Sequence, residues 1–416
     1  MERDQSRLVF FALVFLLSAP FLSGANTWKV EKNGIRTISE AVSNASAGDT
    51  ILVYPGTYYE KNLIIKKQLV IKGIGNPLLD GEKKYELISV AAPGVVIDGL
   101  VLQRCAVSSL NDYAGIKVYH CNNVRIVNCT LRDMFFGIYF LECNNSFAVN
   151  NTIISYGTAE LQSGNGIHCW KCDSMSVLHN RISGHRDGIY FEFVTHSLIR
   201  NNLSTGNIRY GLHFMFSHNN SYVSNTFKNN EAGVAVMYTH NVTMTDNLFI
   251  DNWGDAAYGI LLKEISDSRI EHNRFVNNTA GIYMEGSNRI VVKDNKFSNN
   301  GCALRIQASC DGNTIENNNF ETNTFDVTTN GSLILNTFRN NYWDKYEGYD
   351  LNHDGKGDVP YRPVSLYSMI IDRLPVAGIF LRSFMVAMMD RSERAFPGIT
   401  PGNFMDEAPE MKPNAL

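Results

Sequence analysis

The sequence carries little net charge for its length. Its 416 residues include 37 lysines and arginines against 41 aspartates and glutamates, a formal net charge of −4 at pH 7. The charges are spread along the chain, whereas a nucleic-acid-binding domain usually gathers lysine and arginine in a patch or stripe. The balance therefore argues against nucleic acid as a partner.

A complete zinc motif is also missing. The chain has eight cysteines, but its single CxxC, from Cys169 to Cys172, has no second pair to complete a zinc site. Cys121, Cys143 and Cys172 share one position of the repeat described below. Two interpretations stay open: a disulfide between stacked neighbours, which export permits, or small apolar residues that fill a turn.

Long hydrophobic runs are scarce outside the first residues. The apolar run Leu8–Leu22 follows Arg3 and Arg7 and precedes small residues at Ser23-Gly24-Ala25. It is shorter than the ~20 residues that a membrane-spanning helix needs. The pattern predicts a signal peptide over residues 1–25, with an uncleaved anchor as the alternative. In both cases the body of the protein is exported.

A repeat of about 22 residues fills most of the remaining chain. Gly211-Leu212-His213-Phe214-Met215 is matched 22 residues later by Gly233-Val234-Ala235-Val236-Met237. Equivalent segments begin at Gly115, Gly137, Gly166, Gly188, Gly259 and Gly281. Each unit holds three short strands and three turns, which is too tight for a helical repeat. We expect an all-β fold, a right-handed parallel β-helix of about twelve coils spaced ~4.8 Å apart.

The repeat also sets the expected domain limits. Thr37-Ile38-Ser39-Glu40 is a capping-box signature that predicts a short helix over the first coil. The β-helix with this N-terminal cap is expected over residues 26–345. An acidic loop over 346–364 closes it, amphipathic helices follow over 365–396, and residues 397–416 form a flexible tail.

Strand alternation separates core positions from outward positions. Leu212, Phe214, Val234 and Val236 point inward, and asparagines at one turn are expected to form a structural ladder: Asn128, Asn150, Asn225, Asn247, Asn273, Asn295 and Asn317. Facing outward, Met215 and Met237 become neighbours on adjacent coils. His213 shares their face, and His218 and His240 recur at the following turn.

These outward residues predict a metal site. Thioether and imidazole form a soft ligand set that suits Cu(I) and suits calcium or magnesium poorly. The candidate ligands are Met215, Met237, His213, His218 and His240. One ion can reach both residue types only if a turn folds each histidine back. The alternative is that the methionines pack against a loop or a partner.

A second metal is suggested by an acidic loop. Oxygen-bearing side chains alternate around a glycine at Asp350, Asn352, Asp354 and Asp358, the spacing of a calcium loop. The match is partial, because Tyr361 stands where an EF-hand has its bidentate glutamate. The pattern predicts Ca²⁺, with an acidic turn that merely closes the solenoid as the alternative.

The C-terminal segment is amphipathic. On a helix, one apolar stripe would contain Leu381, Phe384, Met385, Met388, Met389 and Phe396. Val376–Met389 is too short to span a bilayer and contains Arg382. Three interpretations follow: a helix on a membrane surface, a helix that docks into a partner's groove, and a cap on the solenoid.

The main alternative function is a polysaccharide lyase or hydrolase, since long β-helices often host such enzymes. That chemistry needs clustered carboxylates on neighbouring coils. Asp187 and Glu192 with Arg186 and Arg209 are candidates, but methionines occupy the coils where a second outward carboxylate is expected. A metal-free structural adaptor is the third hypothesis.

Four segments resemble one known family. They run from Gly184 to Thr195 (GHRDGIYFEFVT), Arg209 to His218, Gly233 to Tyr238, and Tyr258 to Ile265. They are similar to the NosD family, periplasmic β-helix proteins of the nitrous oxide reductase maturation machinery. The resemblance covers nearly all of the chain after the targeting segment.

The resemblance implies a periplasmic, non-enzymatic protein that handles copper. Its implied partners are an ABC transporter permease with its ATPase, a small lipoprotein copper chaperone, and nitrous oxide reductase, toward whose copper centres the metal passes. It favours docking to the permease for the C-terminal stripe, with only peripheral contact to the inner membrane. It supplies no ligand set, so the five candidate copper ligands rest on the outward columns alone.

Overall fold

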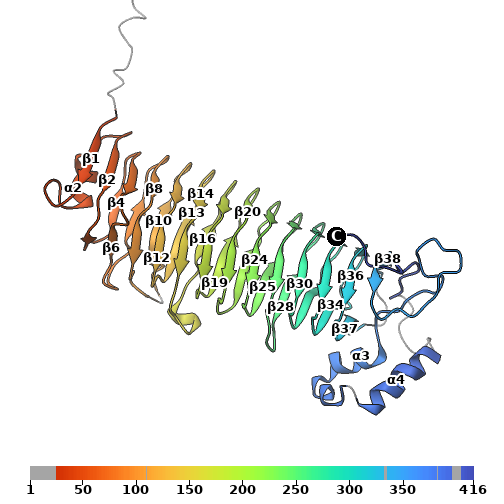
Figure 1. Cartoon of the computed structure of the whole chain (residues 1–416). Coiled ribbons are helices and arrows are strands. Elements are labelled where there is room, and N and C mark those ends of the chain that lie inside the picture. Colours follow the sequence, from red (N-terminus) through yellow and green to blue (C-terminus); the bar gives the residue numbers. More distant parts are fainter. Residues whose placement is uncertain (1–24, 109, 332–334, 382, 396–403) are drawn as a thin grey trace, which may run out of the picture.

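The fold is a rod of stacked coils made from three parallel sheets (Figure 1). The computed structural model describes residues 25–108, 110–331, 335–381, 383–395 and 404–416, so the predicted signal peptide lies almost wholly outside the described residues. Every strand pairs in parallel with its equivalent in the next coil. The predicted right-handed parallel β-helix is confirmed. Its longest sheet has 14 strands, more than the about twelve coils expected from the repeat.

From β2 on, the three sheets follow one another around each coil, so each sheet takes every third strand. Sheet A consists of β1 (Thr27–Val30), β2 (Thr50–Val53), β5 (Val70–Gly73), β8 (Val96–Asp98), β11 (Arg125–Val127), β14 (Phe147–Val149), β17 (Ser176–Leu178), β20 (Leu198–Arg200), β23 (Ser221–Val223), β26 (Thr243–Thr245), β29 (Arg269–Glu271), β32 (Val291–Lys293), β35 (Thr314–Glu316) and β38 (Thr337–Arg339). Sheet B consists of β3 (Thr57–Tyr58), β6 (Leu78–Asp80), β9 (Val101–Gln103), β12 (Thr130–Arg132), β15 (Thr152–Ile154), β18 (Arg181–Ser183), β21 (Leu203–Thr205), β24 (Thr226–Lys228), β27 (Leu248–Ile250), β30 (Arg274–Val276), β33 (Lys296–Ser298), β36 (Asn319–Glu321) and β39 (Tyr342–Trp343). Sheet C consists of β4 (Leu63–Ile65), β7 (Ile88–Val90), β10 (Ala114–Tyr119), β13 (Phe136–Leu141), β16 (Ile167–Trp170), β19 (Asp187–Glu192), β22 (Tyr210–Met215), β25 (Ala232–Met237), β28 (Tyr258–Lys263), β31 (Ala280–Glu285), β34 (Cys302–Ile306) and β37 (Phe325–Thr328).

The core runs the length of the rod as ladders of apolar side chains. Leu212, Phe214, Val234 and Val236 are fully buried, as alternation predicts. On the inner face of sheet B, aromatic rings stack from coil to coil with centroids 4.1 to 5.4 Å apart, in the order Phe227, Phe249, Phe275, Phe297, Phe320 and Trp343. Because each coil buries its apolar face only against its neighbours, the exposed ends of the stack need covers.

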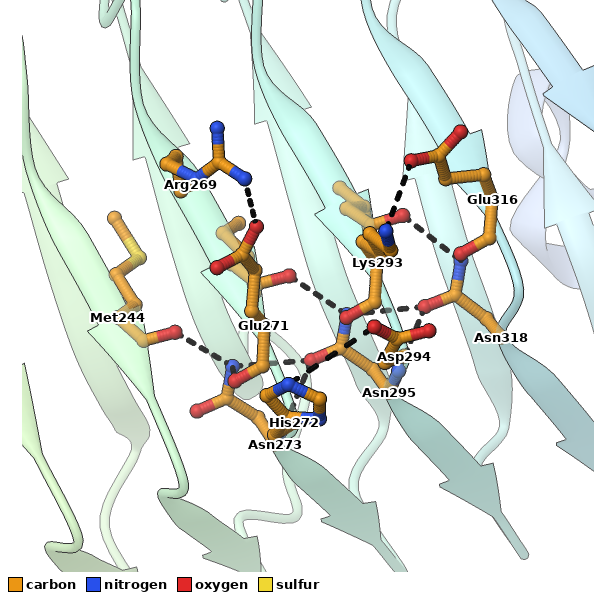
Figure 2. A network of polar contacts seen from close by, with 12 residues as sticks. Met244, Arg269, Glu271, His272, Asn273, Lys293, Asp294, Asn295, Glu316 and Asn318 are labelled. Carbon is orange, nitrogen blue, oxygen red and sulfur yellow. Dashed lines mark hydrogen bonds and ion pairs between the residues drawn. The ribbon is translucent and has the colours of Figure 1, made fainter. Parts of the chain in front are cut away.

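A buried asparagine ladder joins the coils between sheets A and B. Each side-chain amide donates to the carbonyl oxygen of the next asparagine and to a backbone carbonyl, as Figure 2 shows for Asn273, Asn295 and Asn318. Asn225 and Asn247 belong to this ladder. The predicted column mixed two positions, because Asn128, Asn150 and Asn317 precede the buried position and adopt φ values of 54° to 56°.

The stacked cysteines serve as hydrogen-bonding residues. All eight cysteines are buried free thiols. The backbone N–H of Cys143 donates to Cys172 Sγ at 3.4 Å, and the Cys172 thiol faces the Trp170 carbonyl at 3.4 Å. Ser217 makes the same two contacts two coils later, accepting from Val194 N–H and donating to its own strand. The thiols therefore fill this turn column in the role of hydroxyls and not merely as apolar filling.

Different elements cover the two ends of the rod. At the start lies the predicted short helix, α2 (Ile38–Asn44), capped by Thr37, whose hydroxyl accepts from Glu40 N–H at 3.2 Å. At the other end, helix α3 (Leu366–Arg373) packs against β37, with Ser368 Oγ 3.5 Å from the Val327 carbonyl. A 3₁₀ turn, η2 (Pro375–Phe380), leads to helix α4 (Phe384–Ala395). Another, η1 (Glu160–Gln162), lies in an insertion between β15 and β16. No helix in the described part of the chain is long and apolar enough to span a bilayer.

The extreme C-terminus returns to the last coil. Phe404 and Asp406 are buried, and bridges pair residues 406 and 410 with β38 and β39. Asn414 exchanges hydrogen bonds with Asn319. The prediction of a flexible tail is therefore wrong for residues 404–416, which form part of the second cap. Residues 396–403 lie outside the described residues.

Candidate functional site

The two methionines stand side by side on the outer face of sheet C. Met215 ends β22 and Met237 ends β25, and the strand register places them directly opposite each other. Both side chains are half-buried. Adjacent strands lie ~4.8 Å apart, so the two thioethers can converge on one small ion. This confirms their predicted adjacency but does not test what they bind.

His213 lies on the same face but is enclosed. Its ring packs between Tyr190 and Tyr210, with centroids 4.8 Å away on both sides, and it is only 6 % exposed. Its Nδ1 lies 3.6 Å from the buried Asp187 carboxylate. His168 continues this column toward the N-terminus, and burial lowers its pKa to about 3, which keeps it neutral. His213 therefore belongs to a column of packed rings, with Tyr190 and His168, on the same face of sheet C as the methionines.

His218 and His240 form a stacked pair at the next turn. Their ring centroids are 4.0 Å apart, and His240 N–H donates to His218 Nδ1 at 3.3 Å. Burial, followed by the neighbouring His240, lowers the pKa of His218 and favours its neutral form.

An exposed aromatic stack separates the methionines from these histidines along the chain. Phe216 follows Met215 and Tyr238 follows Met237, both at φ values near 50°, so the chain turns directly after each methionine. Phe193, Phe216 and Tyr238 stack with centroids 5.3 and 5.1 Å apart, and each is exposed. The sequence columns missed this stack, because it lies in the turns and not in the strands.

The remaining candidates lie elsewhere or lack support. Among the described residues, no group of three or more histidine, cysteine, aspartate or glutamate side chains is arranged to hold a metal. Asp350 accepts from the backbone N–H groups of Asp354 and Gly355 at 3.2 and 2.9 Å, so the loop closes on itself and the calcium prediction gains no support.

The charged residues proposed for a carbohydrate enzyme do not form an open pair. Asp187 is only 1 % exposed and lies between Arg186, at 3.5 Å, and His213. Arg209 is 3.7 Å from Glu160 of the insertion and covers the Tyr210 ring. Glycoside hydrolysis needs two accessible carboxylates facing one substrate bond, and this face offers Glu192 beside methionines.

Comparison with known proteins shows which family the chain is similar to. Residues 149–348 match the family model described as periplasmic copper-binding protein (NosD). The chain is 26 % identical over 387 residues to the probable ABC transporter binding protein NosD of Stutzerimonas stutzeri, covering 86 % of both chains. It is 28 % identical over 373 residues to the protein of that name from Pseudomonas aeruginosa, covering 85 % of this chain and 86 % of the relative. The chain is thus similar to NosD proteins over most of its length.

The segment that matches the NosD family model contains both methionines, all three candidate histidines and most of sheet C. Solved structures share the fold alone. A family 28 exopolygalacturonase of Yersinia enterocolitica is 12 % identical with a TM-score of 0.55, covering 76 % of this chain and 78 % of that one. The periplasmic alginate epimerase AlgG is 13 % identical with a TM-score of 0.52, covering 70 % and 76 %.

Proposed function

We propose that this protein is a non-enzymatic copper carrier of the periplasm that works with an ABC transporter and supplies metal to nitrous oxide reductase. The observation that carries the proposal is the adjacency of Met215 and Met237 on the outer face of sheet C, within the segment matched by a copper-binding family. Copper is the cargo here. Thioethers prefer Cu(I) over harder ions, and half-buried side chains can exchange it with a partner.

In this proposal the two methionines form the centre of the site. The His218 and His240 pair stands one turn away and supplies imidazoles to copper that arrives or leaves. His213, two residues before Met215 on β22, packs between Tyr190 and Tyr210 and keeps this strand in place. A lipoprotein copper chaperone delivers the ion, the permease and ATPase of the transporter act on the complex, and the reductase receives the copper.

The copper proposal predicts the loss of Cu(I) binding in a double variant. Met215→Ala/Met237→Ala should show no saturable Cu(I) binding, because both soft ligands are gone. Titration of the purified protein against a chromophoric Cu(I) chelator, under anaerobic reducing conditions, measures this. Met385→Ala/Met388→Ala removes two exposed thioethers from α4 and should leave binding unchanged. Equal binding by wild type and Met215→Ala/Met237→Ala would refute the site.

The proposed contact with the permease lies on α4. Phe384, Met385 and Met388 are 80, 52 and 52 % exposed, and Met389 is half-buried. Leu381 precedes the helix and is also exposed. The C-terminal end of the rod is covered by α3 and by residues 404–416. In the described part of the chain, the apolar stripe of α4 is therefore left without an element that covers it. We propose that the stripe docks against the permease and holds the protein at the inner membrane.

Polar substitutions on α4 test this docking. Each large apolar side chain contributes about 1.5–3 kcal/mol when it is fully buried, so Phe384→Ser/Met388→Ser should weaken binding to the detergent-solubilised transporter by about 100-fold. Leu161→Ser, at an equally exposed apolar residue of the insertion, is the control. Deleting residues 365–416 is a poor test, because it also removes the buried Asp406. Unchanged affinity in the double variant would place the interface elsewhere.

A further inference from the structure

Met215 has a carboxylate neighbour on the other side from Met237. The register places Glu192, the last residue of β19, directly opposite Met215. The outer column therefore runs Glu192, Met215, Met237 over three consecutive coils. Glu192 is half-buried like both methionines.

One hydroxyl group contacts both Glu192 and Met215. Tyr190 Oη lies 3.3 Å from Glu192 Oε2 and 3.6 Å from Met215 Sδ. Burial, followed by the charge of Glu192, raises the pKa of Tyr190, so its phenol stays protonated at neutral pH. It carries one hydrogen for two acceptors, of which the carboxylate is the stronger. The hydroxyl thus stands at the point where the carboxylate and the thioether converge.

The same face carries a second Tyr-x-Glu segment, Tyr283 to Glu285, which can be compared with Tyr190 to Glu192. Tyr283 Oη lies 3.4 Å from Glu285 Oε2, much as in the Tyr190 pair. The strand opposite Glu285 carries Lys263, whose Nζ lies 3.7 Å from the carboxylate. Glu285 is therefore neutralised by a lysine, whereas the neighbour of Glu192 in the next coil is a thioether. The two segments share local geometry and differ in the residue beside the carboxylate.

We propose that Glu192 supplies a carboxylate oxygen to the Cu(I) held by Met215 and Met237, and that the Tyr190 hydroxyl occupies this position while the site is empty. The inference rests on the proposed function and adds a third ligand to that site. Two neutral thioethers leave the charge of Cu(I) uncompensated, and Glu192 neutralises it. A hard carboxylate is a weak ligand for this soft ion, so it holds copper without trapping it. When copper arrives, the phenol gives up its contact with Met215 Sδ and keeps its bond to Glu192.

The two residues should change Cu(I) affinity in opposite directions. Glu192→Gln keeps the shape but removes the charge, and should weaken Cu(I) binding about tenfold. Tyr190→Phe frees the thioether from competition with a hydroxyl, and should strengthen binding about threefold. The matched variants Glu285→Gln and Tyr283→Phe should bind as wild type does. Chelator competition measures all four, and thermal unfolding verifies that each variant is folded.

X-ray absorption of the copper-loaded wild type gives a measurement that needs no variant. Two sulfur scatterers and one oxygen, without the outer-shell pattern of an imidazole ring, are expected. A third sulfur or an imidazole pattern would overturn the Glu192 assignment. Equal affinities for Glu192→Gln and Glu285→Gln would also overturn it, while the methionine site would stand if Met215→Ala/Met237→Ala had lost binding. If that double variant binds normally, the proposed function itself fails.

Discussion

Replacing Asp406 by alanine should open the C-terminal end of the β-helix. Asp406 is fully buried, and one of its oxygens accepts from the backbone N–H and the side-chain amide of Asn341, both at 3.0 Å, and from the Trp343 indole at 3.1 Å. Its other oxygen accepts from Asn340 N–H at 3.1 Å. Asn341 is the last asparagine of the buried ladder. Asp406 thus takes the place of the missing next coil.

The expected cost is large because the donors stay buried. Each buried donor that loses its acceptor costs about 1–3 kcal/mol, so Asp406→Ala should destabilise the last coils by about 4 kcal/mol. A long stack of coils need not unfold in one step, so hydrogen exchange of β35 to β39 is the appropriate measurement. Protection there should fall while protection in β10 to β25 persists.

Two other substitutions make the test specific. Asp406→Asn keeps one carbonyl oxygen for Asn341 and Trp343 but turns an amino group toward the Asn340 N–H, so an intermediate loss of protection is expected. Glu407→Ala changes the exposed neighbour and should have little effect. If Asp406→Ala exchanged like Glu407→Ala, residues 404–416 would not act as a cap.

The fold could be predicted from the sequence because its determinants are periodic. A position that recurs every 22 residues or so, with inward Leu212 and Phe214 matched by Val234 and Val236, allows only a stack of short strands. The adjacency of Met215 and Met237 follows from the same period. Residues one repeat apart in the sequence are neighbours in space. The sequence therefore predicts which side chains stack on adjacent coils, in addition to the fold.

Features set by contacts outside the period were not predictable in this way. Residues 404–416 resemble a flexible tail in composition, and only the contacts of Asp406 with the last coil show their role. His213 was correctly placed on the outer face, but its enclosure depends on the sizes of Tyr190 and Tyr210 in neighbouring columns. Strand alternation predicts on which face of the sheet a side chain lies. It does not predict how deeply the neighbouring side chains bury that side chain.

The asparagine ladder shows a subtler limit. Asn128 and Asn225 both sit near the same turn, but Asn128 occupies the left-handed position before the buried column, where Asp246 and His272 also occur. Asparagine suits both positions, for a backbone reason at one and a side-chain reason at the other. A shift of one residue is invisible when both positions favour the same amino acid. The two positions should nevertheless differ strongly in their effect on stability.

Asn247→Ala should therefore be among the most destabilising substitutions in the rod. Its oxygen accepts from the N–H and the amide of Asn225 at 2.9 and 3.0 Å, and its amide donates to the Tyr222 carbonyl and to Asn273 at 2.9 and 3.0 Å. Alanine leaves these buried partners unpaired, at about 1–3 kcal/mol each, so we expect a loss of about 4 kcal/mol in the local opening free energy that hydrogen exchange of β23 to β30 measures. Asn150→Ala, at the left-handed position with a φ of 55°, removes an exposed side-chain hydrogen bond to Asn128 and should cost only about 1 kcal/mol. Similar losses in the two variants would show that water replaces the ladder's hydrogen bonds, and that backbone pairing and apolar stacking join the coils without its help.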